Sequence, residues 1–324
     1  MTITDFVDTM NAWGQQKVPF LFVIDFEMEK PFIARLSDLP ESEISFDING
    51  YTNTSYVDVT DTPIEPLHVT PHDRREYTRK FAHVFERLGY GDSFLTNLTV
   101  KTHVASSNSL QTLFHASRAR YKLLFRNEFL VFSPEIFVQI RDGKIYSYPM
   151  KGTIDAAVPN AAQRILDDEK ERAEHTTIVD LIRNDLSQVA TRVTVNRFRY
   201  LDELRTSHKN LLQVSSEIVG ELPDDYRSRL GSILVTLLPA GSVSGAPKVK
   251  TLEIIRQAEG EKRGYYTGIF GYFNGQQLDS GVMIRFLENQ DGTYYYRSGG
   301  GITTQSQVDA EYQETIDKVY VPLT

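Results

Sequence analysis

Short apolar and β-branched runs recur along the chain and predict strands. They are separated by polar segments and lie at residues 18–26, 93–100, 121–125, 129–132, 137–140, 193–198, 266–273, 281–287 and 293–297. Tight-turn residues join several consecutive runs, namely Arg126-Asn127-Glu128, Asp142-Gly143, Asn274-Gly275 and Asp291-Gly292. Because such turns connect antiparallel strands, the pattern predicts hairpins.

Helical periodicity lies between these runs, at residues 73–88, 167–188, 248–257 and 309–319. Strands and helices do not alternate regularly, which favours an α+β fold with a large antiparallel sheet over a doubly wound parallel sheet. No internal repeat, low-complexity tract or long linker divides the chain. We therefore predict one domain over residues 1–324, in which residues 1–70 could form a reduced N-terminal subregion.

The composition is that of a globular protein, and its net charge restricts the kinds of binding partner that we expect. Of 324 residues, 40% are hydrophobic and 24% charged, and 35 basic against 43 acidic residues give a net charge of −8. This balance argues against nucleic acid and anionic membranes, although a pocket could still bind an anionic small molecule. The absence of cysteine excludes disulfides, zinc–thiolate sites and cysteine nucleophiles. With neither a signal-peptide pattern nor a transmembrane-length apolar run, we expect a cytoplasmic protein.

Two predicted helices carry paired carboxylates. Glu171 and Glu174 are three residues apart, as are Glu311 and Glu314, so each pair shares one helical face. Oxygen ligands from two facing helices would suit Mg²⁺. Acidic residues on a solvated helix face are common, however, so neither pair alone indicates a metal site.

Three further segments could carry chemistry. Lys151 follows a predicted strand between Pro149 and Gly152, which predicts a rigid bend; burial there would make it a nucleophile, as in a metal-independent Schiff-base lyase. Residues 239–248 form a Gly/Ser loop that opens into a helix, an arrangement that favours anions. The glycine cluster 299–301 could bring backbone close to a ligand. On its own Lys151 is better explained as a solvated surface lysine, because most lysines are, and a tight turn would explain each of the two glycine segments.

Taken together, the motifs resemble the chorismate-utilising enzymes, a family that includes the first components of aminodeoxychorismate synthase and anthranilate synthase, isochorismate synthase and salicylate synthase. The resemblance extends over roughly residues 75–320. The motifs that carry it, in the family's order, are Ser133-Pro134-Glu135, Pro149-Met150-Lys151-Gly152-Thr153, Arg172-Ala173-Glu174-His175, residues 178–186, residues 241–248, Tyr266-Thr267-Gly268, Ile284-Arg285, residues 299–302 and Glu311-Tyr312-Gln313-Glu314-Thr315.

The resemblance implies two large, mostly antiparallel sheets packed together with helices outside. It implies an Mg²⁺ ion bound by Glu174 and Glu314, with Glu171 and Glu311 as neighbouring or water-mediated ligands. The metal would hold the ring carboxylate of chorismate. The positions that the resemblance assigns to substrate binding are Thr153, Gly241, Ser242, Tyr266, Arg285, Gly299, Gly300 and Lys318. An arginine suits the enolpyruvyl carboxylate, because a guanidinium binds a carboxylate in bidentate fashion.

Lys151 indicates which member of the family the chain is most similar to. Aminodeoxychorismate synthases have lysine at this position, and anthranilate synthases have alanine. The resemblance implies that Lys151 attacks ring C2 while the C4 hydroxyl leaves with a proton from Glu135, after which ammonia adds at C4 and expels the lysine. A nearby Mg²⁺ and helix-entry dipoles would help to keep the amine neutral. The product would be 4-amino-4-deoxychorismate, a precursor of para-aminobenzoate and folate.

Two departures from the family pattern refine this prediction. Gln213 aligns with a position at which most anthranilate and aminodeoxychorismate relatives have histidine. In anthranilate synthase that histidine is associated with pyruvate release, so its absence weakens the anthranilate alternative. Leu95 aligns with a lysine that activates water in isochorismate and salicylate synthases, so water is disfavoured as the nucleophile. No tryptophan-pocket motif is clear. Ammonia would come from a separate glutamine amidotransferase subunit. Anthranilate synthase component I and a non-catalytic ligand-binding subunit remain the alternatives.

Overall fold

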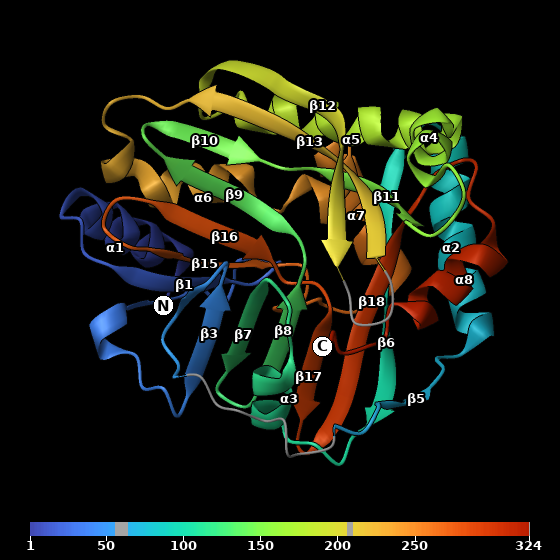
Figure 1. Ribbon diagram of the computed structural model, residues 1–324, viewed down its shortest axis with the longest axis horizontal. Helices are drawn as coiled ribbons and strands as arrows, with labels where there is room; N and C mark the ends of the chain where they lie inside the picture. The colour runs from blue at the N-terminus through green and yellow to red at the C-terminus, as the bar shows by residue number, and fades with distance from the viewer. Residues whose placement is uncertain (56–63, 206–209, 324) are drawn as a thin grey trace.

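The computed structural model describes residues 1–55, 64–205 and 210–323, and these fold into two large antiparallel sheets with helices around them (Figure 1). This arrangement confirms the predicted α+β class. Among the described residues, we find no helix that combines the length and apolarity needed to cross a bilayer.

The first sheet contains strands from almost the whole length of the chain. Its order is β11 (Met150–Asp155), β13 (Asn210–Glu221), β10 (Lys144–Ser147), β9 (Ile136–Arg141), β16 (Leu278–Val282), β15 (Ile269–Phe273), β1 (Phe20–Ile24) and β2 (Phe32–Arg35), and β12 (Thr191–Arg205) also pairs with β13. All of its pairings are antiparallel.

The second sheet is also antiparallel throughout. Its order is β14 (Gly245–Ala246), β6 (Leu95–Ala105), β18 (Thr293–Ile302), β17 (Phe286–Gln290), β8 (Phe129–Ser133), β7 (Tyr121–Phe125), β3 (Ile44–Ile48) and β4 (Tyr51–Thr52), and β5 (His68–Thr70) also pairs with β6. Strands from the first 70 residues therefore enter both sheets.

Helices cover the outer faces (Figure 1). They are α1 (Ile3–Gln15), α2 (Arg74–Gly89), α3 (Leu110–Ala116), α4 (Ala161–Asp167), α5 (Glu169–Leu186), α6 (Leu230–Leu237), α7 (Lys248–Glu259) and α8 (Val308–Asp317), with short 3-10 turns η1 (Leu36–Asp38), η2 (Tyr226–Arg229) and η3 (Gly241–Val243). Helix α5 packs on β11, β12 and β13, whereas α8 packs on β18. These two helices carry the paired glutamates of the sequence.

Strand β1 is apolar at every position because both of its faces are buried. Leu21 and Val23 pack in the cluster between the two sheets, together with residues of β3, β7 and β8. Phe20, Phe22 and Ile24 point the other way and pack with α1 and α6. Because successive side chains of a strand alternate between faces, a strand buried on both faces needs an uninterrupted apolar run.

The predicted hairpin turns are present, and three of them have two consecutive residues with positive φ. These are Arg126-Asn127 (48° and 53°), Asp142-Gly143 (52° and 73°) and Asp291-Gly292 (52° and 86°). Positive φ at both central positions is the requirement of the type I′ turn, which matches the twist of the flanking strands. At Asn274-Gly275 only the glycine has positive φ, 94°.

Two predicted strands are wrong at their boundaries. The run 281–287 contains the end of β16 and the start of β17, and residues 283–285 carry the chain from the first sheet to the second. Arg285 has a φ of 52° at this crossing. The run 266–273 becomes a strand only at Ile269, because Thr267 has a φ of 62° and turns the chain. Both irregular segments lie beside the candidate site.

Candidate active site

A cavity of about 310 Å³ lies between α5 and β11 on one side and β6, β18 and α8 on the other. Most residues predicted for catalysis, substrate binding or the metal line it. They are Glu135, Lys151, Glu174, Ser242, Tyr266, Arg285, Gly299, Gly300, Glu314 and Lys318. A volume of this size suits a small, largely enclosed ligand.

Four predicted residues do not line the cavity. Thr153 is exposed farther along β11, and Gly241 is buried in η3 beside Asp185. Glu171 and Glu311 lie beside the backbone of Gly152 and Gly300. A Cβ atom on Gly152 would come within 2.9 Å of a Glu171 carboxylate oxygen, and one on Gly300 would come within 3.2 Å of a Glu311 carboxylate oxygen.

Lys151 follows strand β10 as predicted but lies within β11, where the predicted bend takes the form of a β-bulge. The register of β11 against β13 is irregular between Met150 and Thr153, and Gly152 has a φ of 83°. This bulge directs Lys151 toward α5, where its Nζ lies 2.8 Å from Glu174 Oε2. Burial lowers the pKa of Lys151, but the carboxylates of Glu174, Glu171 and Glu314 outweigh burial and raise it. With no other ligand, the amine is therefore held as an ammonium.

Glu135 occupies the turn between β8 and β9, and its carboxyl group accepts a hydrogen bond from Ser242 Oγ. The backbone N–H of Glu135 donates to Ser133 Oγ over 3.0 Å, which fixes the turn. Burial raises the pKa of the Glu135 carboxyl, against the opposing effects of Ser242, Arg285 and Lys318. A raised pKa is the property that a general acid near neutral pH requires.

Two further cations, Lys318 and Arg285, line the cavity. Lys318 lies 2.5 Å from Glu314 and donates to the Gly299 carbonyl over 2.7 Å. Burial lowers the pKa of Lys318 despite the nearby carboxylate. The Nε atom of Arg285 is buried and has no hydrogen-bond partner among the described residues. Because a buried polar group is normally satisfied, this donor indicates a place for an anionic ligand.

The carboxylates of α8 converge on the backbone of Gly300. A Cβ atom there would lie 3.2 Å from Glu311 Oε2 and 3.5 Å from Glu314 Oε1, so glycine keeps this space open. No group of three or more potential ligands among His, Asp and Glu is close enough to hold a metal anywhere in the described chain. Mg²⁺ uses one or two carboxylates and takes its remaining oxygens from water and substrate. The donor set of Glu174 and Glu314 fits that requirement.

Further cavity residues carried no signal in the sequence. Asn97 and Thr177 lie on β6 and α5, and residues 303–305 close one side between β18 and α8. Their positions follow from the pairing of distant strands, which local periodicity cannot reveal. Leu95 lines the cavity, as expected of an apolar residue that replaces a base. Gln213 lies instead on β13 and lines a neighbouring cavity of about 690 Å³, which shares Met150 and Arg285 with the first.

The comparisons with known proteins show the family of the chain. The chorismate binding enzymes match residues 8–324, and the chain belongs to this family. It is 49% identical over its full length to a PabA-like protein of Pasteurella multocida whose name describes it as uncharacterized, and the alignment covers all of that protein.

Two further relatives are similar over a smaller share of their length. Aminodeoxychorismate synthase component 1 of Escherichia coli is 34% identical over 76% of this chain and 56% of that protein. The crystal structure of anthranilate synthase component I from Streptococcus pneumoniae has a TM-score of 0.67 and 27% identity, over 80% of this chain and 60% of that one.

Proposed function

We propose that this member of the family is an aminodeoxychorismate synthase component I, which aminates chorismate at C4. The observation that carries the proposal is that Lys151 and Glu135 line one cavity with two cations and a carboxylate pair. A nucleophile, an acid with a raised pKa and anion-binding groups are the parts that this reaction requires. A non-catalytic subunit would need neither Lys151 nor Glu135.

The substrate is a dicarboxylate, and the cavity offers separate cations for its two ends. Arg285 would bind the enolpyruvyl carboxylate through two parallel hydrogen bonds, helped by Tyr266 and the backbone of Gly299. Lys318 lies next to Glu314 and would assist in holding the ring carboxylate. Glu174 and Glu314 would hold Mg²⁺, which would coordinate that carboxylate. Because the metal would then compete with Lys151 for these glutamates, it would lower the pKa of Lys151 and favour the neutral amine.

The reaction can be written so that atoms and charges balance. The neutral Lys151 nitrogen bonds to C2, the two ring double bonds shift, and the C4–O bond breaks as Glu135 protonates the leaving hydroxyl to give water. Ammonia then bonds to C4, the double bonds shift back, and the bond between C2 and Lys151 breaks. Glu135 takes a proton from the added nitrogen. The sum is chorismate plus ammonia giving 4-amino-4-deoxychorismate plus water.

Ammonia would come from a separate glutamine amidotransferase. This chain has no cysteine, so it cannot supply the cysteine nucleophile that hydrolyses glutamine in many such enzymes. Ammonium salt at high concentration should therefore replace glutamine when the chain is assayed alone.

Anthranilate synthase component I is the second candidate, favoured by the structural similarity to the Streptococcus pneumoniae enzyme. The departure at Gln213 still argues against pyruvate release and stays a prediction; Gln213 lines the neighbouring cavity that shares Met150 and Arg285 with this one. Incubation of the purified chain with chorismate, Mg²⁺ and an ammonium salt separates the two candidates. Para-aminobenzoate that forms only after an aminodeoxychorismate lyase is added supports the proposal. Anthranilate and pyruvate without the lyase would contradict it.

A further inference from the structure

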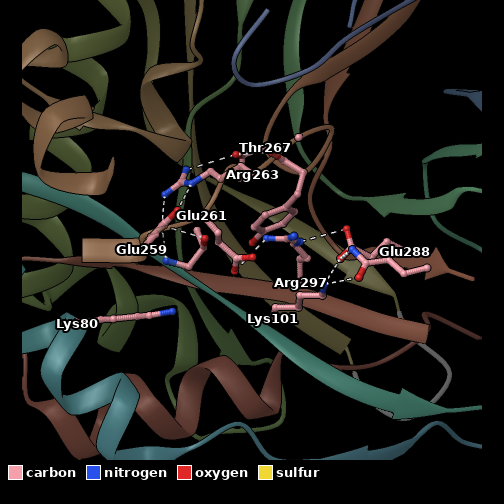
Figure 2. A network of polar contacts seen from close by, with 12 residues as sticks. Lys80, Lys101, Glu259, Glu261, Arg263, Thr267, Glu288 and Arg297 are labelled. Atoms are coloured by element: carbon pink, nitrogen blue, oxygen red, sulfur yellow. Dashed lines mark hydrogen bonds and ion pairs between the residues drawn. The ribbon is translucent and has the colours of Figure 1, made fainter. Parts of the chain in front are cut away.

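A buried ion pair joins the end of α7 to the segment that precedes Tyr266. Arg263 is 2% exposed and Glu259 is 6% exposed. The guanidinium binds the carboxylate in bidentate fashion, with Nε 2.9 Å from Oε2 and Nη2 2.6 Å from Oε1 (Figure 2). Neither residue lines the candidate active site.

The remaining donors of Arg263 all reach residues that do line the cavity. Nη1 donates to the Val243 carbonyl over 2.8 Å and to Thr267 Oγ1 over 3.3 Å, and Nη2 donates to the Asn97 carbonyl over 2.8 Å. These three acceptors belong to η3, to the turn after Tyr266, and to β6. One planar side chain therefore ties together three walls that come from distant parts of the sequence.

Glu259 extends the same connection into the second sheet. Its Oε1 atom accepts hydrogen bonds from the backbone N–H and the hydroxyl of Thr99, both over 2.9 Å. Thr99 pairs across the sheet with Gly299, which lines the cavity beside Lys318. The carboxylate thus fixes Arg263 and the strand that places Gly299.

Such a buried ion pair contributes little to the free energy of unfolding, because the cost of transferring two charges out of water offsets most of their attraction. A rigid fork that satisfies several acceptors in fixed directions is, in contrast, a good way to hold walls in register. We propose that Arg263 and Glu259 are positioning residues that set the affinity for chorismate by aligning Tyr266, the loop of Ser242 and the backbone of Gly299. Lys151 and Glu135 stand on segments that the pair does not contact.

Three variants test this inference: Arg263→Lys, Arg263→Met and Thr99→Val. Thr99→Val keeps the shape of the Thr99 side chain but removes its hydroxyl hydrogen bond to Glu259. Chorismate is titrated calorimetrically into each variant with Mg²⁺ and without ammonium. Melting temperature is measured in parallel. Every protein in the titration, the reference included, carries Lys151→Ala, which forms no covalent adduct with chorismate, so the result depends neither on that adduct nor on the proposed amination. Lys122→Met is the matched control. Lys122 is also a buried cation, and it donates hydrogen bonds to the Phe114 and Ser117 carbonyls, but none of these residues lines the cavity.

We expect Arg263→Lys to change the melting temperature little but to weaken chorismate binding by about tenfold or more. A small displacement of the residues that contact the ligand lowers affinity even when the substitution lies far from them. Thr99→Val should weaken binding by about threefold, near the lower limit for one hydrogen bond. Lys122→Met should lower the melting temperature without changing affinity. Wild-type affinity in both Arg263→Lys and Thr99→Val would overturn the inference, and Thr99→Val alone decides if the Arg263 variants do not fold.

Discussion

Replacing Arg285 tests how the cavity recognises the enolpyruvyl carboxylate. Arg285 lies where the chain crosses between the sheets, and its buried Nε atom has no hydrogen-bond partner among the described residues. Two substitutions separate charge from geometry. Arg285→Gln removes the charge, and Arg285→Lys keeps it but loses the planar fork.

The expected magnitude follows from the number of hydrogen bonds lost. A hydrogen bond to a charged group contributes about 1.5–3 kcal/mol. Loss of both bonds and the charge in Arg285→Gln should cost about 3–5 kcal/mol, which is about 10²–10⁴-fold in kcat/KM. Arg285→Lys retains one bond and should cost about 1.5–2 kcal/mol, or about 10–30-fold.

Steady-state kinetics with chorismate, at saturating Mg²⁺ and ammonium, gives both values. Arg192→Lys is the control, because it makes the same change at an exposed arginine that pairs with Glu221 and does not line the cavity. The control should stay close to the wild-type rate. If Arg285→Lys were within about threefold of wild type, less than one hydrogen bond to a charged group would have been lost, and the assigned role of Arg285 would be refuted.

Two further predictions concern the metal and pH. Glu174→Gln and Glu314→Gln should each raise the Mg²⁺ concentration needed for half-maximal turnover while circular dichroism stays unchanged; wild-type turnover at limiting Mg²⁺ would refute the metal assignment. Burial lowers the pKa of His175 from 6.5 to about 4. The unfolded chain then binds more protons at low pH, so stability falls as the pH drops from about 6.5 to 4, by about 3 kcal/mol at most. Urea unfolding of His175→Gln should show a weaker pH dependence in that window, and an unchanged one would count against this cause.

Local signals in the sequence predicted local structure well. Arg126-Asn127 and Asp291-Gly292 form the turns that their residue types indicate, because a type I′ turn depends on only two residues. The run 281–287 misled because both β16 and β17 are buried, so apolar residues continue through the crossing at Arg285. Periodicity does not distinguish one long buried strand from two short ones in different sheets.

The candidate site depended on long-range pairing and could not be predicted from spacing. Lys151 and Glu174 meet because β11 and α5 pack together, and their motifs were connected only through the family resemblance. Arg263 gave no signal at all, since Glu261-Lys262-Arg263 has the composition of an exposed loop. Its burial follows from acceptors on two distant segments, at Asn97 and Val243.

Intact-protein mass spectrometry tests the central proposal, that Lys151 is the nucleophile, most directly. The chain is mixed with chorismate and Mg²⁺ without ammonia, quenched, and digested to locate any modification. The account predicts an adduct with the mass of chorismate less one water on Lys151, absent from Lys151→Ala and lost when ammonium is added before the quench. Amination by Lys151→Ala at the wild-type rate, with no adduct in either protein, would contradict it.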